Sequence, residues 1–401
     1  MPHLYINVKG QPWKKHSYSA GNTFDQCPLK YYYQKVLGWK ERDNKARFQF
    51  GKALEEAIQY HHDHDGHGAV EHFKTIWAAN KDSNILTYTA TEKDWETCNR
   101  MGIDMIRLYV AIQPTLPIPL GGRSVFQREY KKEVFPGDPN YGEIEDAGKL
   151  DIVVYADWEH PLLPRVAEAM RKGPYRQMIV DIKTSAVKYP DTPGIAAQDT
   201  QLRRYSWLSG MRLVAFLVFV KTSLGYKKGS DVRFLEPVGD YKPGDEGVIA
   251  KIDGDKLSIV RGDFMIAEME RIQGKKTDKN GVEKLDQTDI AKERVDVWLN
   301  QFAVQVTPDQ VTKQRVQFLV GVVSEKGAED AGLIAGRQIV SIVNASKSKQ
   351  WPNTFGVRYP HDDTNDSYFK AFVMGDENFK NQNFIKTDEE TLDDLFKEDI
   401  E

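Results

Sequence analysis

The chain has 401 residues, of which 40% are hydrophobic and 28% are charged, which is the composition of an ordinary globular protein. Its length allows one large domain with an insertion, or two domains. No apolar run approaches the roughly eighteen residues of a membrane helix, and no charged-then-apolar signal opens the chain, so we expect no membrane association. The two cysteines suit a reducing compartment.

The net charge of −4 conceals an uneven distribution along the chain. Residues 376–401 hold ten acidic residues and three lysines, a charge of −7, so the remaining 375 residues sum to +3. A mildly basic body with an acidic tail fits an enzyme that acts on DNA better than the total charge suggests.

The first half of the chain predicts helices followed by a sheet. Residues 17–60 follow a helical pattern, in which we expect Gly38 to end one helix and Gly51 to begin the next. A second helical pattern covers Thr91–Ile112. The following segments predict, in order, strands over Val125–Val134, Lys149–Ala156 and Met178–Lys183, a helix over Ala196–Leu208, and a strand over Leu213–Val220. This order predicts an α/β sandwich with a mixed sheet.

The second half of the chain changes in character. Short apolar runs separated by turn residues predict a small antiparallel β insertion within residues 223–285. Helices are expected at Ile290–Phe302 and from Thr307, where a Thr-Pro-Asp-Gln sequence combines an N-cap with a capping-box residue. We therefore divide the chain into a core over 1–222, the insertion over 223–285, a helical part packing on the core over 286–375, and a flexible acidic tail over 376–401.

One short motif suggests chemistry. Asp181-Ile182-Lys183 ends an apolar run, and alternation along a strand places Asp181 and Lys183 on one face. A second carboxylate, Asp151, lies in the preceding predicted strand. Two carboxylates can hold a hard divalent cation, and a neighbouring lysine can stabilise charge on a phosphate. A D-x-K triplet alone is more often an ordinary surface salt bridge, because isolated triplets of this kind are common.

Three further motifs accompany this one. They are Phe24-x-x-Cys27-Pro28-x-x-Tyr31-x-Tyr33, the helix segment Gly51-Lys52-Ala53-Leu54-Glu55-Glu56, and Gln201-x-x-x-Tyr205. With Asp151 and Asp181-x-Lys183, their order resembles the RecB-like branch of the PD-(D/E)XK nuclease superfamily over residues 17 to 222. The resemblance implies a nuclease core over 1–222 with a restriction-endonuclease-like α/β/α fold and a mixed sheet, to which this chain adds the small β insertion and further helices.

The resemblance also implies a set of site residues. One or two Mg²⁺ or Mn²⁺ ions would be held by Glu55, Asp151, Asp181 and the carbonyl of Ile182, Lys183 would be the catalytic amine, and Gln201 and Tyr205 would support it. Glu55 stands where the family often has histidine, and the offset from Gly51 selects it over Glu56. Many relatives bind an iron–sulfur cluster through four cysteines, which Cys27 and Cys98 alone cannot do, so we expect no cluster. Trp351–Gly356 is expected to close that part of the fold by packing.

Several residues are candidates for nucleic-acid binding. Arg203 and Arg204 could grip phosphate, although one could equally serve only the surface. Tyr32 could stack on a base, but three consecutive tyrosines cannot all face one groove, so at least one of Tyr31–Tyr33 belongs to the core. Lys275 and Lys276 lie in a loop that would extend the DNA path. The histidine-rich stretch Tyr60–His67 is favoured as a polar helix end and loop rather than a metal cluster.

These observations predict a metal-dependent deoxyribonuclease, an exonuclease acting on DNA ends or single strands in recombination, repair or phage DNA processing. Its expected partners are DNA and, through the acidic tail, a protein; its expected location is the cytoplasm of a bacterium or of a phage-infected host. No G-x-x-x-x-G-K-[ST] sequence for ATP-driven unwinding occurs. The rival hypotheses are a catalytically inactive DNA-binding or assembly protein on the same fold and a structural protein. Polarity of digestion and oligomeric state are not readable from the sequence.

Overall fold

The structure of the protein is a computed structural model. It describes residues 13–41, 44–81, 86–88, 94–164, 173–221, 231–234, 237, 242–253, 256–261, 264–268, 276–277, 283–284, 303–305, 316–354 and 367–386. No helix in these ranges is long and apolar enough to cross a membrane.

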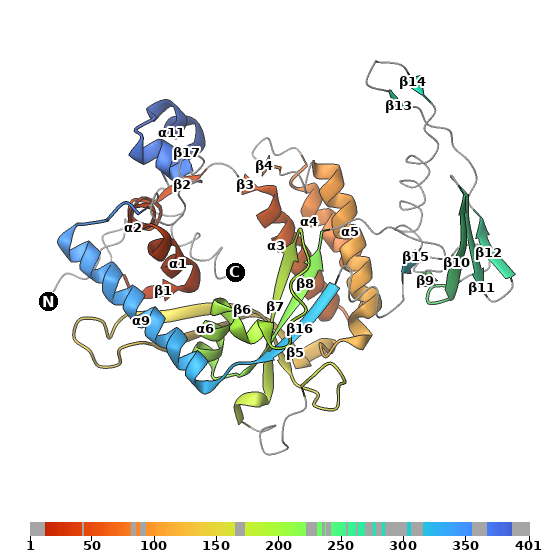
Figure 1. Ribbon diagram of the computed structural model, residues 1–401, viewed down its shortest axis with the longest axis horizontal. Coiled ribbons are helices and arrows are strands. Elements are labelled where there is room, and N and C mark those ends of the chain that lie inside the picture. The colour runs from red at the N-terminus through yellow and green to blue at the C-terminus, as the bar shows by residue number, and fades with distance from the viewer. Residues whose placement is uncertain are drawn as a thin grey trace.

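A six-stranded mixed sheet forms the centre of the molecule (Figure 1). Its order is β1-β6-β7-β8-β16, with β5 paired to β6; β1 is parallel to β6, β7 is parallel to β8, and the other pairs are antiparallel. The strands are β1 Lys15–Ser17, β5 Ser124–Glu133, β6 Glu145–Tyr155, β7 Gln177–Ser185, β8 Leu213–Val220 and β16 Val316–Val322. The sheet confirms the predicted mixed α/β class, and β5 to β8 lie close to the predicted ranges.

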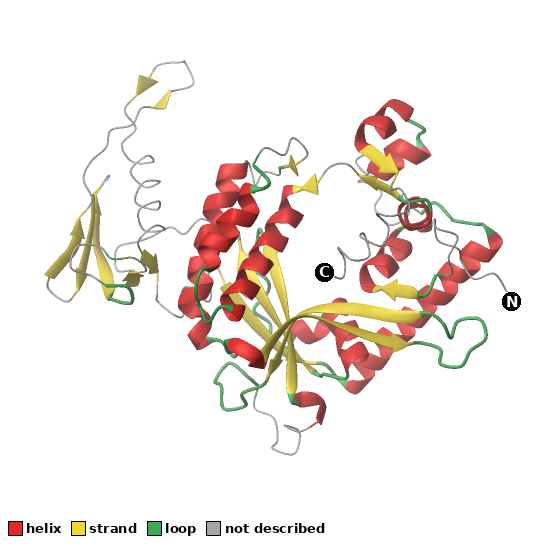
Figure 2. Ribbon diagram, turned by 180° about the vertical axis from the view of Figure 1, so that it is seen from behind, coloured by secondary structure: helices red, strands yellow, loops and turns green. Residues whose placement is uncertain are grey.

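One face of the sheet is covered by α3 Ala46–Asp63, α4 Ala69–Ala78 and α5 Trp95–Ile112 (Figure 2). Their apolar residues recur at helical spacing and pack on Ile152, Val180 and Leu217 of the sheet. The expectation that Gly51 opens a helix is wrong, because α3 begins five residues earlier, at Ala46. Gly38 does end the preceding segment, with φ 70°.

The opposite face is covered by α6 Thr200–Ser209 and α9 Glu325–Ser348. Every residue of β8 is buried, as expected for a strand with helices on both faces. The strand β16 was not anticipated from the sequence; it pairs with β8 along its full length and completes the sheet after the insertion. The helices predicted at Ile290–Phe302 and from Thr307 lie outside the described residues.

The remaining N-terminal elements lie beside α9, at the end of the sheet where β1 joins β6 (Figure 1). They are α1 Tyr18–Gln26, α2 Pro28–Tyr31 and a π-helical turn, Tyr32–Val36. The ring of Trp351 stacks on Tyr31 and Tyr32, with centroids 6.1 and 5.2 Å apart, and the Leu29 N–H donates to the Pro352 carbonyl. Trp351 and Pro352 therefore close the fold around the buried Cys27 by packing, as predicted for this segment.

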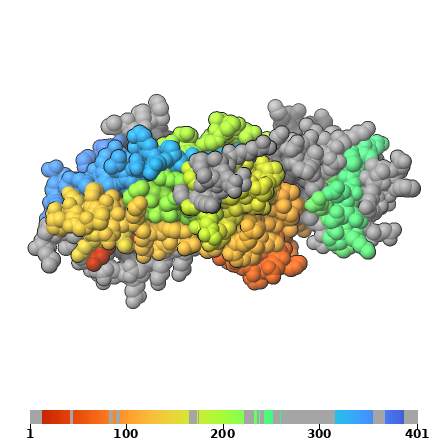
Figure 3. Space-filling model, turned by 90° about the horizontal axis from the view of Figure 1, so that it is seen from below, coloured from red at the N-terminus to blue at the C-terminus, as the bar shows by residue number. Residues whose placement is uncertain are grey.

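The insertion contains a second, five-stranded antiparallel sheet of order β12-β11-β10-β9-β15. Its strands are β9 Asp231–Phe234, β10 Glu246–Asp253, β11 Lys256–Arg261, β12 Phe264–Glu268 and β15 Ala303–Gln305. In Figure 3 the described parts of this sheet lie at one end of an elongated molecule, and α9 lies at the other. The antiparallel strands agree with the sequence analysis, although β15 extends the sheet beyond residue 285.

Short elements complete the described structure. Strand β2 Trp39–Glu41 pairs with β17 Phe384–Lys386, which follows α11 Glu377–Asn383, and Phe384 is buried against Tyr368. The expectation of a flexible tail from residue 376 is therefore wrong for residues 376–386; residues 387–401 lie outside the described ranges. The remaining short elements are β3 Asn44–Lys45, β4 Leu86–Thr87, β13 Lys276–Thr277, β14 Glu283–Lys284, a π-helical turn Phe369–Val373, and single 3₁₀ turns at Gln113–Thr115, Gly121–Arg123, Gly173–Tyr175 and Ile195–Gln198.

Candidate active site

The candidate site lies where β6 changes its neighbour. Strand β5 occupies one edge of β6, so β1 and β7 share the other edge. On that edge β6 pairs with β1 over Glu145–Ala147 and with β7 from Ile152 onward. Residues 148–151 lie between these two partners. Asp151 projects from this interval, and its Oδ2 accepts a hydrogen bond of 2.8 Å from the Ile182 N–H of β7. The change of partner along β6 thus brings Asp151 next to the Asp181-x-Lys183 motif of β7.

The Asp181-x-Lys183 motif is arranged as alternation requires. Lys183 Nζ lies 2.7 Å from Asp181 Oδ2 and 3.1 Å from Gln201 Oε1. The Gln201 amide in turn donates to the Tyr205 hydroxyl at 2.8 Å. Gln201 and Tyr205 are one turn apart on α6, whose N-terminus is capped by Asp199. The four side chains form one chain of polar contacts from the sheet to the helix.

Glu55 reaches the same place from α3, which contacts β7 on the other face of the sheet. Gly51 lies one turn earlier on α3 and faces β7, where a Cβ would make an ordinary van der Waals contact, 3.7 Å from Thr184 Oγ1. Burial, and next the Asp181 charge, raises the pKa of Glu55 to about 7. Glu55 Oε1 is buried, and it has no hydrogen-bond partner among the described residues.

The other ionisable groups show how strongly these charges interact. Burial raises the pKa of Asp151, and the neighbouring Asp181 and Glu55 raise it further. Burial also raises the pKa of Asp181, against the opposing effect of Lys183. For Lys183 burial alone would lower the pKa, but the neighbouring carboxylates, Asp181 first, together outweigh burial, and the pKa lies above its usual value. Three carboxylates surround Lys183, and Lys149 adds a second positive charge near Glu55, so the carboxylates outnumber the ammonium groups.

This donor set suits a hard divalent cation. Within the described ranges no group of three or more His, Cys, Asp or Glu side chains is already gathered at metal-binding distances. Glu55 Oε1 and Asp181 Oδ1 are nevertheless buried oxygens without hydrogen-bond partners in the described structure, and such atoms are costly unless they bind a donor or a cation. The Ile182 carbonyl faces the same gap as its N–H, because both groups of a strand residue point to one edge. All are oxygen ligands, as Mg²⁺ and Mn²⁺ prefer.

Arg204 is not available to a phosphate, and the expectation that it binds DNA is corrected. Its side chain is only 3% exposed and forms a two-pronged ion pair with the buried Asp146 of β6. It also donates to Gln338 Oε1 of α9 at 2.9 Å, and the Gln338 amide donates to Asp25 of α1 at 2.7 Å. Arg204 therefore ties α6, β6, α9 and α1 together inside the protein.

The other predicted nucleic-acid residues have different environments. Arg203 donates from Nε to the Ala197 carbonyl and from Nη2 to Gln198, which holds the turn before α6. Tyr32 is half-buried and stacks on Trp351, whereas Tyr31 is the core tyrosine of the block. Lys275 lies outside the described residues, and only the backbone of Lys276, in β13, is described. These residues remain predictions.

The histidine-rich stretch forms no metal cluster in the described structure. His61 and His62 are buried in the last turn of α3, and His62 Nε2 lies 2.6 Å from the Tyr109 hydroxyl. Burial lowers the pKa of His62 to about 4. The rings of His64 and His72 stack on the two sides of Tyr60. The stretch is thus more deeply packed than the polar end and loop we expected, since His61 and His62 belong to the core.

Three residues at the site were not singled out from the sequence. Lys149 precedes Asp151 by two positions on β6, and its charge acts on Glu55. Tyr189 follows β7, and the charges of Lys183 and Asp181 both act on it. The Gln317 side chain of β16 accepts from the Tyr189 N–H at 2.8 Å and donates to its carbonyl at 2.9 Å, like a neighbouring strand. Lys149 and Asp151 are two positions apart on one strand, so alternation could have placed Lys149 on the same face as Asp151. No local pattern identifies Gln317.

The comparison with protein families finds a match. A family model described as the PD-(D/E)XK nuclease superfamily matches residues 15–118. The match indicates a metal-dependent nuclease. The matched range includes the Phe24–Tyr33 motif and Glu55 but ends before Asp151, so the strands with the acid–acid–lysine set lie beyond it. The RecB-like branch is not distinguished by this match.

Other comparisons add little. No match is found among curated proteins. A solved structure described as "Crystal structure of SSO0001" aligns at 12% sequence identity and a TM-score of 0.19, covering 45% of this chain and 63% of that chain. This chain therefore spans less than two thirds of that protein, and the likeness is too low to support a statement about fold or function.

Proposed function

We propose that the protein is a divalent-metal-dependent deoxyribonuclease that hydrolyses phosphodiester bonds. The observation that carries the proposal is the convergence of Glu55, Asp151, Asp181 and Lys183 at the gap between β6 and β7, with unpartnered carboxylate oxygens beside a lysine. The superfamily match over residues 15–118 supports it from a separate part of the chain.

The chemistry divides between a bound ion and the protein. Glu55, Asp151, Asp181 and the Ile182 carbonyl would hold Mg²⁺ or Mn²⁺, which lowers the pKa of water and neutralises charge on a phosphate. Lys183, kept protonated by Asp181, places a positive charge where the phosphate gains negative charge in the transition state. Gln201 fixes the direction of the ammonium, and Tyr205 fixes the Gln201 amide. Asp151 holds β7 against β6 through the Ile182 N–H.

The finer assignment is part of the same proposal. The motif order over residues 17 to 222 favours a RecB-like enzyme that acts on DNA ends or single strands in recombination, repair or phage DNA processing, in the cytoplasm of a bacterium or of an infected host. Arg203, Tyr32, Lys275 and Lys276 are proposed to contact DNA outside the catalytic groups. The acidic residues 387–401 are proposed to repel DNA or to contact a protein partner.

Digestion of three labelled DNAs tests the proposal. An end-labelled duplex, its single strand and a closed circle are incubated with Mg²⁺, with Mn²⁺ or with EDTA. We expect the ions to support cleavage, EDTA to stop it, and the closed circle to resist. Cleavage of the circle would replace the exonuclease assignment with an endonuclease. DNA binding without cleavage under any ion would favour the inactive DNA-binding protein instead.

A further inference from the structure

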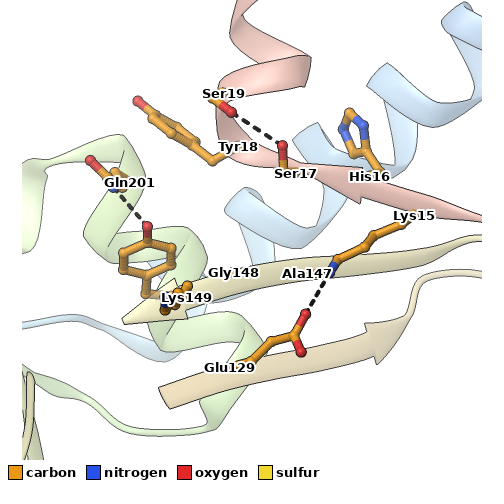
Figure 4. Close-up of a pocket in the computed structure, with 11 residues that line it drawn as sticks. Lys15, His16, Ser17, Tyr18, Ser19, Glu129, Ala147, Gly148, Lys149 and Gln201 are labelled. Carbon is orange, nitrogen blue, oxygen red and sulfur yellow. Dashed lines mark hydrogen bonds and ion pairs between the residues drawn. The ribbon is translucent and has the colours of Figure 1, made fainter. Parts of the chain in front are cut away.

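A cavity of about 210 Å³ adjoins the candidate active site where β6 lies between its two neighbours (Figure 4). It is lined from the end of β1 and the start of α1 by residues 15–19, from β5 by Glu129, from β6 by residues 147–149, and from α6 by Gln201 and Tyr205. Figure 4 shows that these residues come from separate elements around one space. None of the roles assigned above uses this cavity.

The lining offers more positive than negative charge. Lys15 Nζ lies 2.6 Å from Glu129 Oε1, and Lys149 stands directly opposite Glu129 in the pairing of β5 with β6. Lys131 Nζ lies 3.5 Å from the other oxygen of Glu129, so this carboxylate has a second cationic partner. The hydroxyl groups of Ser17 and Ser19 lie 3.2 Å apart and add neutral hydrogen-bond donors.

The cavity is continuous with the catalytic groups. Gln201 lines it, while the Gln201 side-chain oxygen accepts from Lys183. Lys149 lines it and lies near enough to Glu55 for its charge to favour ionised Glu55. Gln201 and Lys149 thus join the cavity to the groups around Asp181 and Lys183.

We propose that this cavity is a second phosphate subsite, which binds a phosphate of the same DNA strand whose scissile phosphodiester lies at Asp181 and Lys183. The inference rests on the proposed nuclease function and adds to it the recognition of a second phosphate. Lys15 leaves Glu129 for the phosphate, and Glu129 retains Lys131 as its partner. The hydroxyls of Ser17 and Ser19 and the ammonium of Lys149 complete the set of donors.

The first test compares Lys15→Met with Lys14→Met. Lys14 is the matched control, because it is adjacent in sequence and also pairs with a glutamate, Glu143 at 3.5 Å, but does not line the cavity. Binding of a labelled single strand in EDTA is measured by fluorescence anisotropy over a series of salt concentrations. We expect Lys15→Met to bind about tenfold more weakly and to reduce the salt slope by about 0.7, as for one lost phosphate contact. Equal behaviour of the two variants would overturn the subsite.

The second test uses Glu129→Gln, which removes the same ion pair from its other end. This change frees Lys15 and should tighten binding of the strand, whereas Lys15→Met should weaken it. A purely structural role for the pair predicts a loss in both variants, and that result would also overturn the subsite. Thermal unfolding of each variant shows whether it is folded at the assay temperature, and binding is compared only below that unfolding range.

A third set of strands identifies which phosphate is bound. One carries a 5′-phosphate, one a 5′-hydroxyl, and one a neutral methylphosphonate at single internal positions. If the difference in affinity between wild type and Lys15→Met disappears with the 5′-hydroxyl strand, the subsite holds a terminal phosphate. If this difference disappears when one internal position carries a methylphosphonate, the subsite holds that internal phosphate. Persistence of the full effect on all strands would contradict phosphate binding. Failure of the nuclease proposal is separate: wild-type protein would then bind these strands but cleave none with Mg²⁺ or Mn²⁺.

Discussion

Replacing Glu55 with glutamine should separate the stability of the metal-free protein from its ability to bind metal. The pKa of Glu55 is raised from 4.5 to about 7, first by burial and next by Asp181. The folded state therefore holds this proton more tightly than the unfolded state does. The stabilisation is fully present below pH 4.5 and is lost as the pH rises through 7. A shift of about 2.5 pH units corresponds to about 3 kcal/mol.

Glutamine has no proton to lose, so Glu55→Gln should escape this loss. In EDTA, the variant should gain up to about 3 kcal/mol of unfolding free energy relative to wild type between pH 4.5 and pH 8. With Mn²⁺ at pH 8 the order should reverse, because only wild type retains the charged ligand and is stabilised by the bound ion. Urea denaturation followed by circular dichroism measures both differences.

Glu56→Gln is the matched control, since it removes the same charge one position along α3. It should give neither the pH-dependent gain in EDTA nor the loss of stabilisation by Mn²⁺. The reasoning fails if wild type and Glu55→Gln differ by the same amount at pH 5 and pH 8, or if Glu56→Gln reproduces the effect.

Three further changes test other parts of the account. Arg204→Met leaves the buried Asp146 without its partner and should lower the unfolding free energy by about 3–5 kcal/mol in urea denaturation, whereas an unchanged stability would contradict a structural role. Gln317→Leu leaves the Tyr189 N–H and carbonyl unpaired, costs about 1–3 kcal/mol, and should speed hydrogen exchange at Tyr189; unchanged exchange would show that Gln317 does not hold this loop. Trp351→Ala removes the stacking on Tyr31 and Tyr32 and should lower the unfolding free energy by about 2 kcal/mol in urea denaturation, whereas an unchanged stability would show that this stacking does not close the fold.

Local patterns predicted much of the central sheet and part of the site. Alternation along β7 was enough to place Asp181 and Lys183 on one face, and the i to i+4 spacing placed Gln201 beside Tyr205. The apolar runs of β6 to β8 predicted strands because burial on one or both faces determines their composition. Helix α3 was recognised, but its start was missed because Gly51 was taken to open the helix, whereas the helix begins at Ala46 and runs through Gly51.

Features that depend on distant partners could not be predicted. Arg204 resembled its neighbour Arg203 in sequence, and only the approach of Asp146 and Gln338 shows that one of them is buried. Strand β16 pairs with β8 across the whole insertion, so nothing adjacent to Val316–Val322 indicates the pairing. Likewise, β17 forms by pairing with β2, which is far away in the chain. The polar residues that precede and follow β17 do not indicate this strand.

The most direct test of the central claim is cleavage of an end-labelled DNA strand by wild type, Asp181→Ala and Lys183→Ala, with Mn²⁺ binding measured by calorimetry on the same samples. The account predicts metal-dependent cleavage at the full rate by wild type only. Lys183→Ala should lose about 10²–10³ in rate while it still binds Mn²⁺, whereas Asp181→Ala should lose cleavage together with Mn²⁺ affinity. Wild-type turnover in either folded variant, or cleavage that continues in EDTA, would contradict the account.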